Sequence, residues 1–159
     1  MPPCSRQATD VPPITTTTEI NRPAAEVFDF ATDPTRFGEW QKGVVDGRMD
    51  HAAGTPQVGT HCLTTRRIGG ANRPSTSELT HIDPPRTWGV HGIDGPIRAT
   101  VDLTVEPVSD TRSRLTIAVD FEGHGLGKIL VPLMVRREAQ KEMPANLAAL
   151  KRQLEAPAD

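Results

Sequence analysis

The segment IRATVDLTVEPVSDTRSRLTIAVDFE, Ile97–Glu122, carries the clearest structural signal in the chain. Apolar residues alternate with polar ones in both of its halves; they are Ile97, Ala99, Val101, Leu103 and Val105 in the first half and Leu115, Ile117, Val119 and Phe121 in the second. A period of two is typical of a β-strand with one buried face. The turn-forming stretch Val108–Ser113 separates the halves. We therefore predict two antiparallel strands, Ile97–Glu106 and Arg114–Glu122, that share one apolar face.

Further strands and two short helices are predicted upstream of this hairpin. The strands are Val44–Asp50, Gly59–Ile68, Ser75–Ile82 and Thr87–Ile93, separated by turns of Gly, Pro, Asp and Asn. A β-branched stretch from Ile14 predicts one more strand, which runs into a short helix at Pro23. A second short helix is expected to begin at Pro34, with Asp33 as its N-cap.

Downstream of the hairpin the apolar residues return at helical spacing from Leu126 to Glu155. The apolar positions are Leu126, Ile129, Leu130, Leu133, Met143, Leu147, Leu150 and Leu154, and the middle of the segment is polar. The predicted order is a strand, two short helices, six antiparallel strands and a long C-terminal helix. This is an α+β chain with the element order of the helix-grip fold.

Length and composition limit the possible classes of function. A chain of 159 residues fits one domain, which we predict over 14–155, with tails at 1–13 and 156–159. The 18 basic and 20 acidic residues form no long run of one sign, so the overall balance predicts neither nucleic acid nor an anionic membrane as a partner. The apolar stretch Leu126–Val135 is too short for a membrane span, and Met1–Pro13 lacks the features of a signal peptide. These features predict a cytoplasmic protein without an integral membrane segment.

Four stretches of the sequence carry a resemblance to a known family. They are INRPAAEVFDFATDPTRFGEW (Ile20–Trp40), VGT (Val58–Thr60), IDPPRTWGV (Ile82–Val90) and MPANLAALKRQLE (Met143–Glu155). In order and spacing they resemble the polyketide cyclase/dehydrase-like members of the START-related SRPBCC superfamily, over about Ile14–Glu155. The resemblance implies a curved antiparallel sheet around the long helix, with a hydrophobic cavity between them. Members of the family include carriers of lipids and other hydrophobic ligands, as well as cyclases and dehydratases.

The implied cavity and the apolar pattern together predict the ligand-binding residues. They are Phe37, Trp40, Trp88, Val90, Val101, Leu103, Val119, Phe121, Leu130, Leu133 and Met134. In the resemblance the two short helices close one end of the cavity, which makes Phe37 and Trp40 candidates for its wall. Packing in a solid core under the helices is the alternative role for these rings.

Two polar side chains are candidates for the same cavity. Arg66 and Arg67 are adjacent in one predicted strand, so one of them must face the inner side of the sheet unless the strand ends first. An inward guanidinium needs a carboxylate partner or an anionic or carbonyl-rich ligand. His91 is the second candidate, because it lies beside Trp88 and Val90 in sequence.

The sequence contains no recognisable catalytic or metal-binding motif. The histidines His51, His61, His81, His91 and His124 lack metal-ligand spacing, and Cys4 and Cys62 suffice for neither a disulfide framework nor a zinc site. GHGLGK, Gly123–Lys128, does not have the spacing of a phosphate-binding loop. Asp102 and Asp120 should face away from the apolar side of the hairpin, which argues against a catalytic pair. We therefore predict no cofactor and no metal.

Three functions remain open from the sequence. The first is a protein, monomeric or homodimeric, that binds a hydrophobic or amphipathic small molecule, lipid-like or polyketide-like, in an internal cavity. The second is a cyclase or dehydratase that acts on such a ligand. The third is a regulatory or interaction protein with a vestigial cavity.

Overall fold

A computed structural model describes residues 13–50, 56–95, 97–123 and 130–157, and only the backbone of 97, 123 and 130–134. The elements along the chain are β1 (Ile14–Ile20), α1 (Ala24–Ala31), the 3₁₀ helix η1 (Pro34–Glu39), β2 (Val44–Asp50), β3 (His61–Ile68), β4 (Ala71–Asp83), β5 (Thr87–Gly92), β6 (Ile97–Ser109), β7 (Arg112–Gly123) and α2 (Leu130–Glu155). Most of the predicted N-terminal tail, together with His51, His124 and residues 124–128 of the Gly-rich segment, lies outside the described residues.

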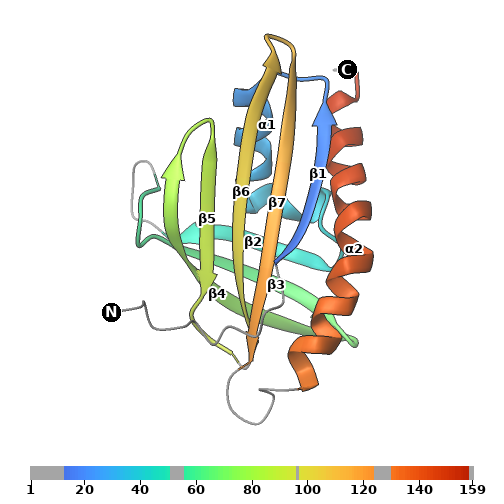
Figure 1. Cartoon of the computed structure of the whole chain (residues 1–159). Coiled ribbons are helices and arrows are strands. Elements are labelled where there is room, and N and C mark those ends of the chain that lie inside the picture. Colours follow the sequence, from blue (N-terminus) through green and yellow to red (C-terminus); the bar gives the residue numbers. More distant parts are fainter. Residues whose placement is uncertain (1–12, 51–55, 96, 124–129, 158–159) are drawn as a thin grey trace, which may run out of the picture.

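The strands form one seven-stranded antiparallel sheet in the order β1-β7-β6-β5-β4-β3-β2. Helix α2 packs on β1 and β7, and α1 packs on β6 and β7 (Figure 1). We call the face of the sheet toward these helices, which carries Leu103 and Leu115, the inner face, and the opposite side the outer face. The structure confirms the predicted helix-grip architecture and the order of its elements.

The predicted element boundaries differ from the observed ones mainly where prolines occur. β4 begins at Ala71, four residues before the predicted start, and runs through Pro74. β6 continues through Pro107 to Ser109, so the last hairpin turns at 110–111. The predicted C-terminal helix is described from Leu130 onward.

The segment η1 contains Phe37 and is followed directly by Trp40, two of the predicted cavity rings. Asp33 caps it as predicted, because its Oδ1 accepts hydrogen bonds from the Thr35 N–H (3.0 Å) and hydroxyl (2.6 Å). Gly47 of β2 allows η1 to approach closely, since a Cβ at Gly47 would lie 3.0 Å from the Pro34 carbonyl carbon and nearer still to its oxygen. This close approach packs η1, which carries Phe37, against β2.

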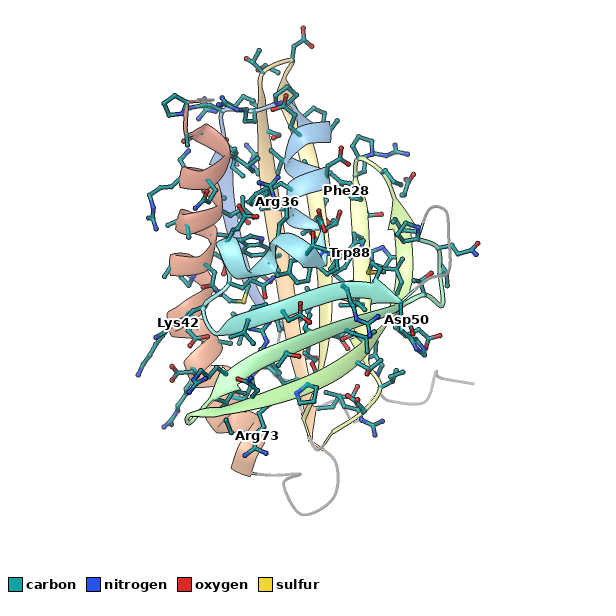
Figure 2. All side chains as sticks on the ribbon, turned by 180° about the vertical axis from the view of Figure 1, so that it is seen from behind. Phe28, Arg36, Lys42, Asp50, Arg73 and Trp88 are labelled. Carbon is teal, nitrogen blue, oxygen red and sulfur yellow. The ribbon has the colours of Figure 1, made fainter. Side chains whose placement is uncertain are left out.

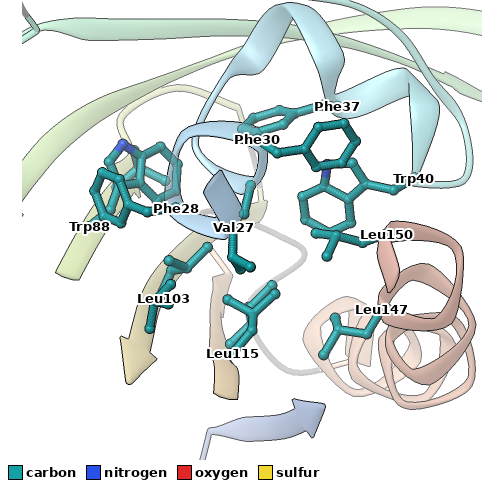
Figure 3. Packing of buried hydrophobic residues seen from close by; sticks show 14 of the residues in the cluster. Val27, Phe28, Phe30, Phe37, Trp40, Trp88, Leu103, Leu115, Leu147 and Leu150 are labelled. Atoms are coloured by element: carbon teal, nitrogen blue, oxygen red, sulfur yellow. The ribbon is translucent and has the colours of Figure 1, made fainter. Parts of the chain in front are cut away.

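The hydrophobic core lies between the inner face and the three helical segments (Figure 3). Its largest fully buried side chains are Ile20, Leu79, Leu103, Leu115, Leu147, Leu150, Val27 and Val105. Polar contacts fix the C-terminal end of α2 to β1: Lys151 Nζ donates to the Glu19 carbonyl (2.6 Å), and Glu155 Oε1 accepts from the Asn21 N–H (2.8 Å). Helix α2 is therefore held at this end by both apolar packing and hydrogen bonds.

Candidate functional site

The inner face of β6 and β7 is covered at one end and partly uncovered at the other. Leu103 and Ile117 are 2% and 4% exposed where α1 and α2 cover the sheet. Val101 precedes Leu103 by two residues in β6, and Val119 follows Ile117 by two residues in β7. Val101 and Val119 pair with each other, and both side chains are only half-buried. Phe121, two residues farther on, is also half-buried. The inner face therefore presents apolar surface that the described residues do not fully cover.

Polar side chains continue this inner face onto β3 and β4. The register pairs Cys62 with Ser77 and Thr64 with Ser75, and the Thr64 and Ser75 hydroxyls are 3.1 Å apart. Ser77 lies two residues before Leu79, which is buried in the core. Because residues two apart share a face, Cys62, Thr64 and Arg66 all lie on the inner side.

Arg66 is the inward member of the arginine pair. Its Nη2 donates a 2.7 Å hydrogen bond to Oε1 of Gln41, in the connection between η1 and β2. Burial lowers the pKa of the Arg66 guanidinium, while the negative charge of Glu142 on α2 raises it in part. The guanidinium nonetheless stays charged near neutral pH. Arg67, the next residue, is exposed on the outer side.

Three of the four aromatic residues predicted for the cavity lie together at the covered end. Phe37 makes edge-to-face contacts with Trp40 (centroids 5.9 Å apart) and with Trp88 (6.3 Å). All three rings are at least nine-tenths buried, and Leu150 lies beside Trp40 (Figure 3). The Trp40 Nε1–H is buried without a hydrogen-bond partner among the described residues. Phe37 thus joins the two tryptophans of the chain into one ring cluster.

The remaining predicted cavity residues fall into two groups. Val90 and Leu103 lie on the inner face, 6% and 2% exposed. Leu130, Leu133 and Met134 belong to the first turns of α2, and their side chains lie outside the described part of the structure. The helix wall of the predicted cavity is therefore not described.

His91 lies on the outer face, opposite to Val90. Its Nδ1 is 2.8 Å from the Thr100 hydroxyl, and its Nε2 is 3.8 Å from Glu122. The structure thus separates His91 from Arg66 and from the inner apolar residues. Among the described residues no three His, Cys, Asp or Glu side chains are grouped so that they could hold a metal ion.

Asp102 and Asp120 each have a different partner. Asp102 pairs on the outer face with His81 (2.8 Å). Asp120 accepts hydrogen bonds from the Phe121 N–H (3.0 Å) and from Arg136 of α2 (2.8 Å). These contacts give the two carboxylates separate structural roles.

An open cleft lies beside Arg66's partner Gln41. It has a volume of about 450 Å³ and separates residues Gly38–Lys42 from α2. Trp40 and Gln41 line one side, and Glu142 and Asn146 line the other. The Lys42 N–H donates to Asn146 Oδ1 (3.1 Å) and ties the two sides together.

Sequence reasoning missed several polar neighbours of Arg66. Gln41, Glu142, Thr64 and Ser75 were not among the predicted site residues. Glu142 had a weak signal, because it belongs to the polar middle of the C-terminal helix. Gln41 had none, since its role depends on the path of the chain after η1. The candidate site therefore combines an apolar patch with a polar group around Arg66.

Comparison with known proteins agrees with this architecture. Residues 12–155 match the family described as polyketide cyclase/dehydrase and lipid transport. A START superfamily protein from Mycobacterium smegmatis is 15% identical, with a TM-score of 0.74 over 91% of this chain and 98% of that one. The Zhui aromatase/cyclase from Streptomyces sp. R1128 is 15% identical, with a TM-score of 0.73 over 89% of this chain and 92% of that one.

A further solved structure is larger than this chain. The di-domain aromatase/cyclase BexL from the BE-7585A biosynthetic pathway is 17% identical, with a TM-score of 0.70 over 89% of this chain, which spans 45% of BexL. No curated protein matches the chain. Among the described residues no helix is long and apolar enough to span a membrane.

The order of the elements and the topology of the sheet define a helix-grip fold. The chain belongs to the polyketide cyclase/dehydrase and lipid transport family.

Proposed function

We propose that this protein binds a hydrophobic or amphipathic small molecule, lipid-like or polyketide-like, between the inner face of the sheet and α2. The observation that carries this proposal is the half-buried apolar patch of Val101, Val119 and Phe121. It lies on the same strands and face as Leu103, Val105, Leu115 and Ile117, which are buried. Apolar surface inside a fold is stabilised by an apolar guest rather than by water. In this proposal the protein acts in the cytoplasm, as a monomer or a homodimer.

Arg66 supplies the polar end of the proposed site. Its guanidinium is half-buried and donates to the neutral amide of Gln41, which leaves other N–H groups for a ligand. A carboxylate or a polarised carbonyl suits that planar set of donors. Of the predicted cavity residues, we propose Leu130, Leu133 and Met134 for the helix wall of the site, and the buried residues Phe37, Trp40, Trp88, Val90 and Leu103 for its closed end. In this proposal the ligand enters by the cleft beside Gln41.

Tryptophan emission tests the proposal, because Trp40 and Trp88 are the only tryptophans in the chain. A fatty acid or a polycyclic aromatic that enters the site should change the emission in a saturable way. Val119→Phe adds bulk to the half-buried patch and should abolish this change. Val108→Phe adds the same bulk at an exposed position and should leave the change intact. If the emission of the wild type does not change with any ligand of a broad panel, the proposal is refuted. The remaining function is then that of a regulatory or interaction protein.

The polar end can be tested separately with a matched pair of ligands. A fatty acid and the fatty alcohol of equal chain length differ only in the group that Arg66 would hold. Arg66→Gln should weaken binding of the acid by about tenfold or more, since hydrogen bonds to charged groups contribute about 1.5–3 kcal/mol. Binding of the alcohol should change little. Equal losses for both ligands would remove Arg66 from the site.

A second candidate function is a cyclase or dehydratase. The polar group around Arg66, on the same face of the sheet as the apolar patch, favours this function, because such an enzyme must fold a reactive chain and move protons. An enzyme of this type should convert a poly-β-ketone substrate, and Glu142→Gln should lower turnover more than binding. A carrier should bind the substrate and release it unchanged.

A further inference from the structure

The overall charge balance of the chain conceals one region of a single sign. Between His51 and Ser77 there is no Asp or Glu, and this stretch contains Arg66, Arg67 and Arg73. The chain as a whole has a formal net charge of −2. The part of the β3–β4 hairpin up to Ser77, which includes its turn, is therefore basic in an otherwise weakly acidic protein.

The turn of this hairpin stands clear of the rest of the described structure. Gly69 and Gly70 form it with φ angles of 58° and 80°, and nothing lies within 4 Å of a Cβ placed on either one. Every residue from Arg67 to Pro74 is exposed. Ile68, at the end of β3, is 58% exposed. The hairpin thus presents a large apolar side chain at a projecting turn.

The cations around Ile68 lack protein partners among the described residues. Neither Arg67 nor Arg73 has a side-chain hydrogen bond or ion pair there, and Lys42, near Arg67 on the adjacent chain segment, also has a free ammonium group. Figure 2 shows Lys42 and Arg73 at the same end of these strands as the turn. The acidic residue of β2 nearest to the turn is Asp46. It pairs with Thr65, which lies farther from the turn along β3 than Arg66 and Arg67 do.

The register adds a second sign of excess positive charge in this hairpin. Arg66 and Arg73 are directly opposite each other in the β3–β4 ladder. Like charges in this position repel and destabilise a sheet. An anionic surface against the hairpin would relieve that repulsion.

We propose that the tip of the β3–β4 hairpin, Arg67–Arg73 together with Lys42, docks on a lipid bilayer that contains anionic lipids. Phosphate and carboxylate headgroups complement the three cations, and the interface accepts the apolar Ile68 side chain. A single-stranded nucleic acid would instead require aromatic side chains for base stacking, and the tip has none. The same hairpin carries Arg66, Thr64 and Ser75, so docking brings the inner face close to a source of lipids.

Vesicle flotation tests this proposal on the full chain. The wild type should bind phosphatidylcholine vesicles that contain phosphatidylserine, should release them as salt is raised, and should not bind pure phosphatidylcholine. Each basic residue near an anionic bilayer contributes about fivefold to binding, so Arg67→Gln with Arg73→Gln should weaken vesicle binding about 25-fold. Ile68→Ser should weaken it about tenfold through lost apolar insertion.

Two exposed arginines away from the tip provide a charge-matched control. Arg48→Gln with Arg152→Gln lowers the net charge equally and should retain wild-type binding. The tip variant should also keep the tryptophan response to monomeric ligand, which separates this proposal from the proposed function. The proposal is overturned if the wild type ignores anionic vesicles, if both double variants bind equally well, or if single-stranded DNA competes as strongly as vesicles do.

Discussion

Leu150→Ala tests whether α2 contributes its apolar face to a common core with the sheet. The Leu150 side chain is fully buried and lies beside Trp40 (Figure 3). The substitution removes three carbon atoms, which corresponds to about 2.4 kcal/mol of lost transfer free energy at about 0.8 kcal/mol each. The cavity left behind adds to this loss, so the expected destabilisation is about 3–5 kcal/mol. For a chain of this size the melting temperature should fall by roughly 10 °C.

Urea unfolding followed by circular dichroism measures the effect. The midpoint should fall while the dependence of the unfolding free energy on urea stays the same, because the fold itself is retained. Leu154→Ala is the matched control in the same helix. Because Leu154 is only half-buried, this substitution should lower the free energy of unfolding clearly less than Leu150→Ala does. A loss below about 1 kcal/mol for Leu150→Ala would mean that this side of α2 is not core, and the account of the fold would fail.

Three further predictions concern other parts of the molecule. Gly47→Ala should lower the unfolding free energy by about 1–3 kcal/mol, because the new Cβ meets the Pro34 carbonyl. Unchanged urea unfolding would contradict the close approach of η1 to β2. The Asn21 N–H and Lys151 lower the pKa of Glu155 below 4.5, so its stabilisation is present above that pH and is lost as pH falls through the lowered value. The unfolding free energies of wild type and Glu155→Gln should therefore differ at pH 7 and converge in acid, and a gap that persists at low pH would count against this linkage. Burial raises the pKa of Cys62 to about 11, so iodoacetamide at pH 8 should alkylate Cys62 only after unfolding in urea. Peptide mass spectrometry separates Cys62 from Cys4, and alkylation of Cys62 in the native chain would show that its thiol is accessible.

Strand alternation predicted most of the fold because one face of this sheet is apolar. The hairpin of β6 and β7 shows a clean period of two, and its inner residues were identified correctly. The extents of β4 and β6 were underestimated, because Pro74 and Pro107 interrupt the strand signal in the sequence while the chain remains extended through them. Proline removes a donor but does not prevent a β conformation.

The polar part of the candidate site was harder to predict. β3 has no clean alternation around Arg66 and Arg67, so its inward face could not be assigned from sequence alone. Bulges between Val44 and Asp46 and between Leu79 and His81 also change which residues face inward. The sequence did contain evidence that His91 faces outward. Val90 was predicted to face inward, and neighbouring residues in a strand face opposite sides.

Native mass spectrometry of the protein purified gently from its own host tests the central claim most directly. If the protein binds a hydrophobic or amphipathic molecule at the Val101, Val119 and Phe121 patch, the wild type should carry one small molecule per chain. Val119→Phe, purified in the same way, should have the mass of the chain alone, while Val108→Phe should retain the molecule. A wild type that has only its own mass, and that gains none after incubation with lipids and polyketide-like compounds, would contradict the account.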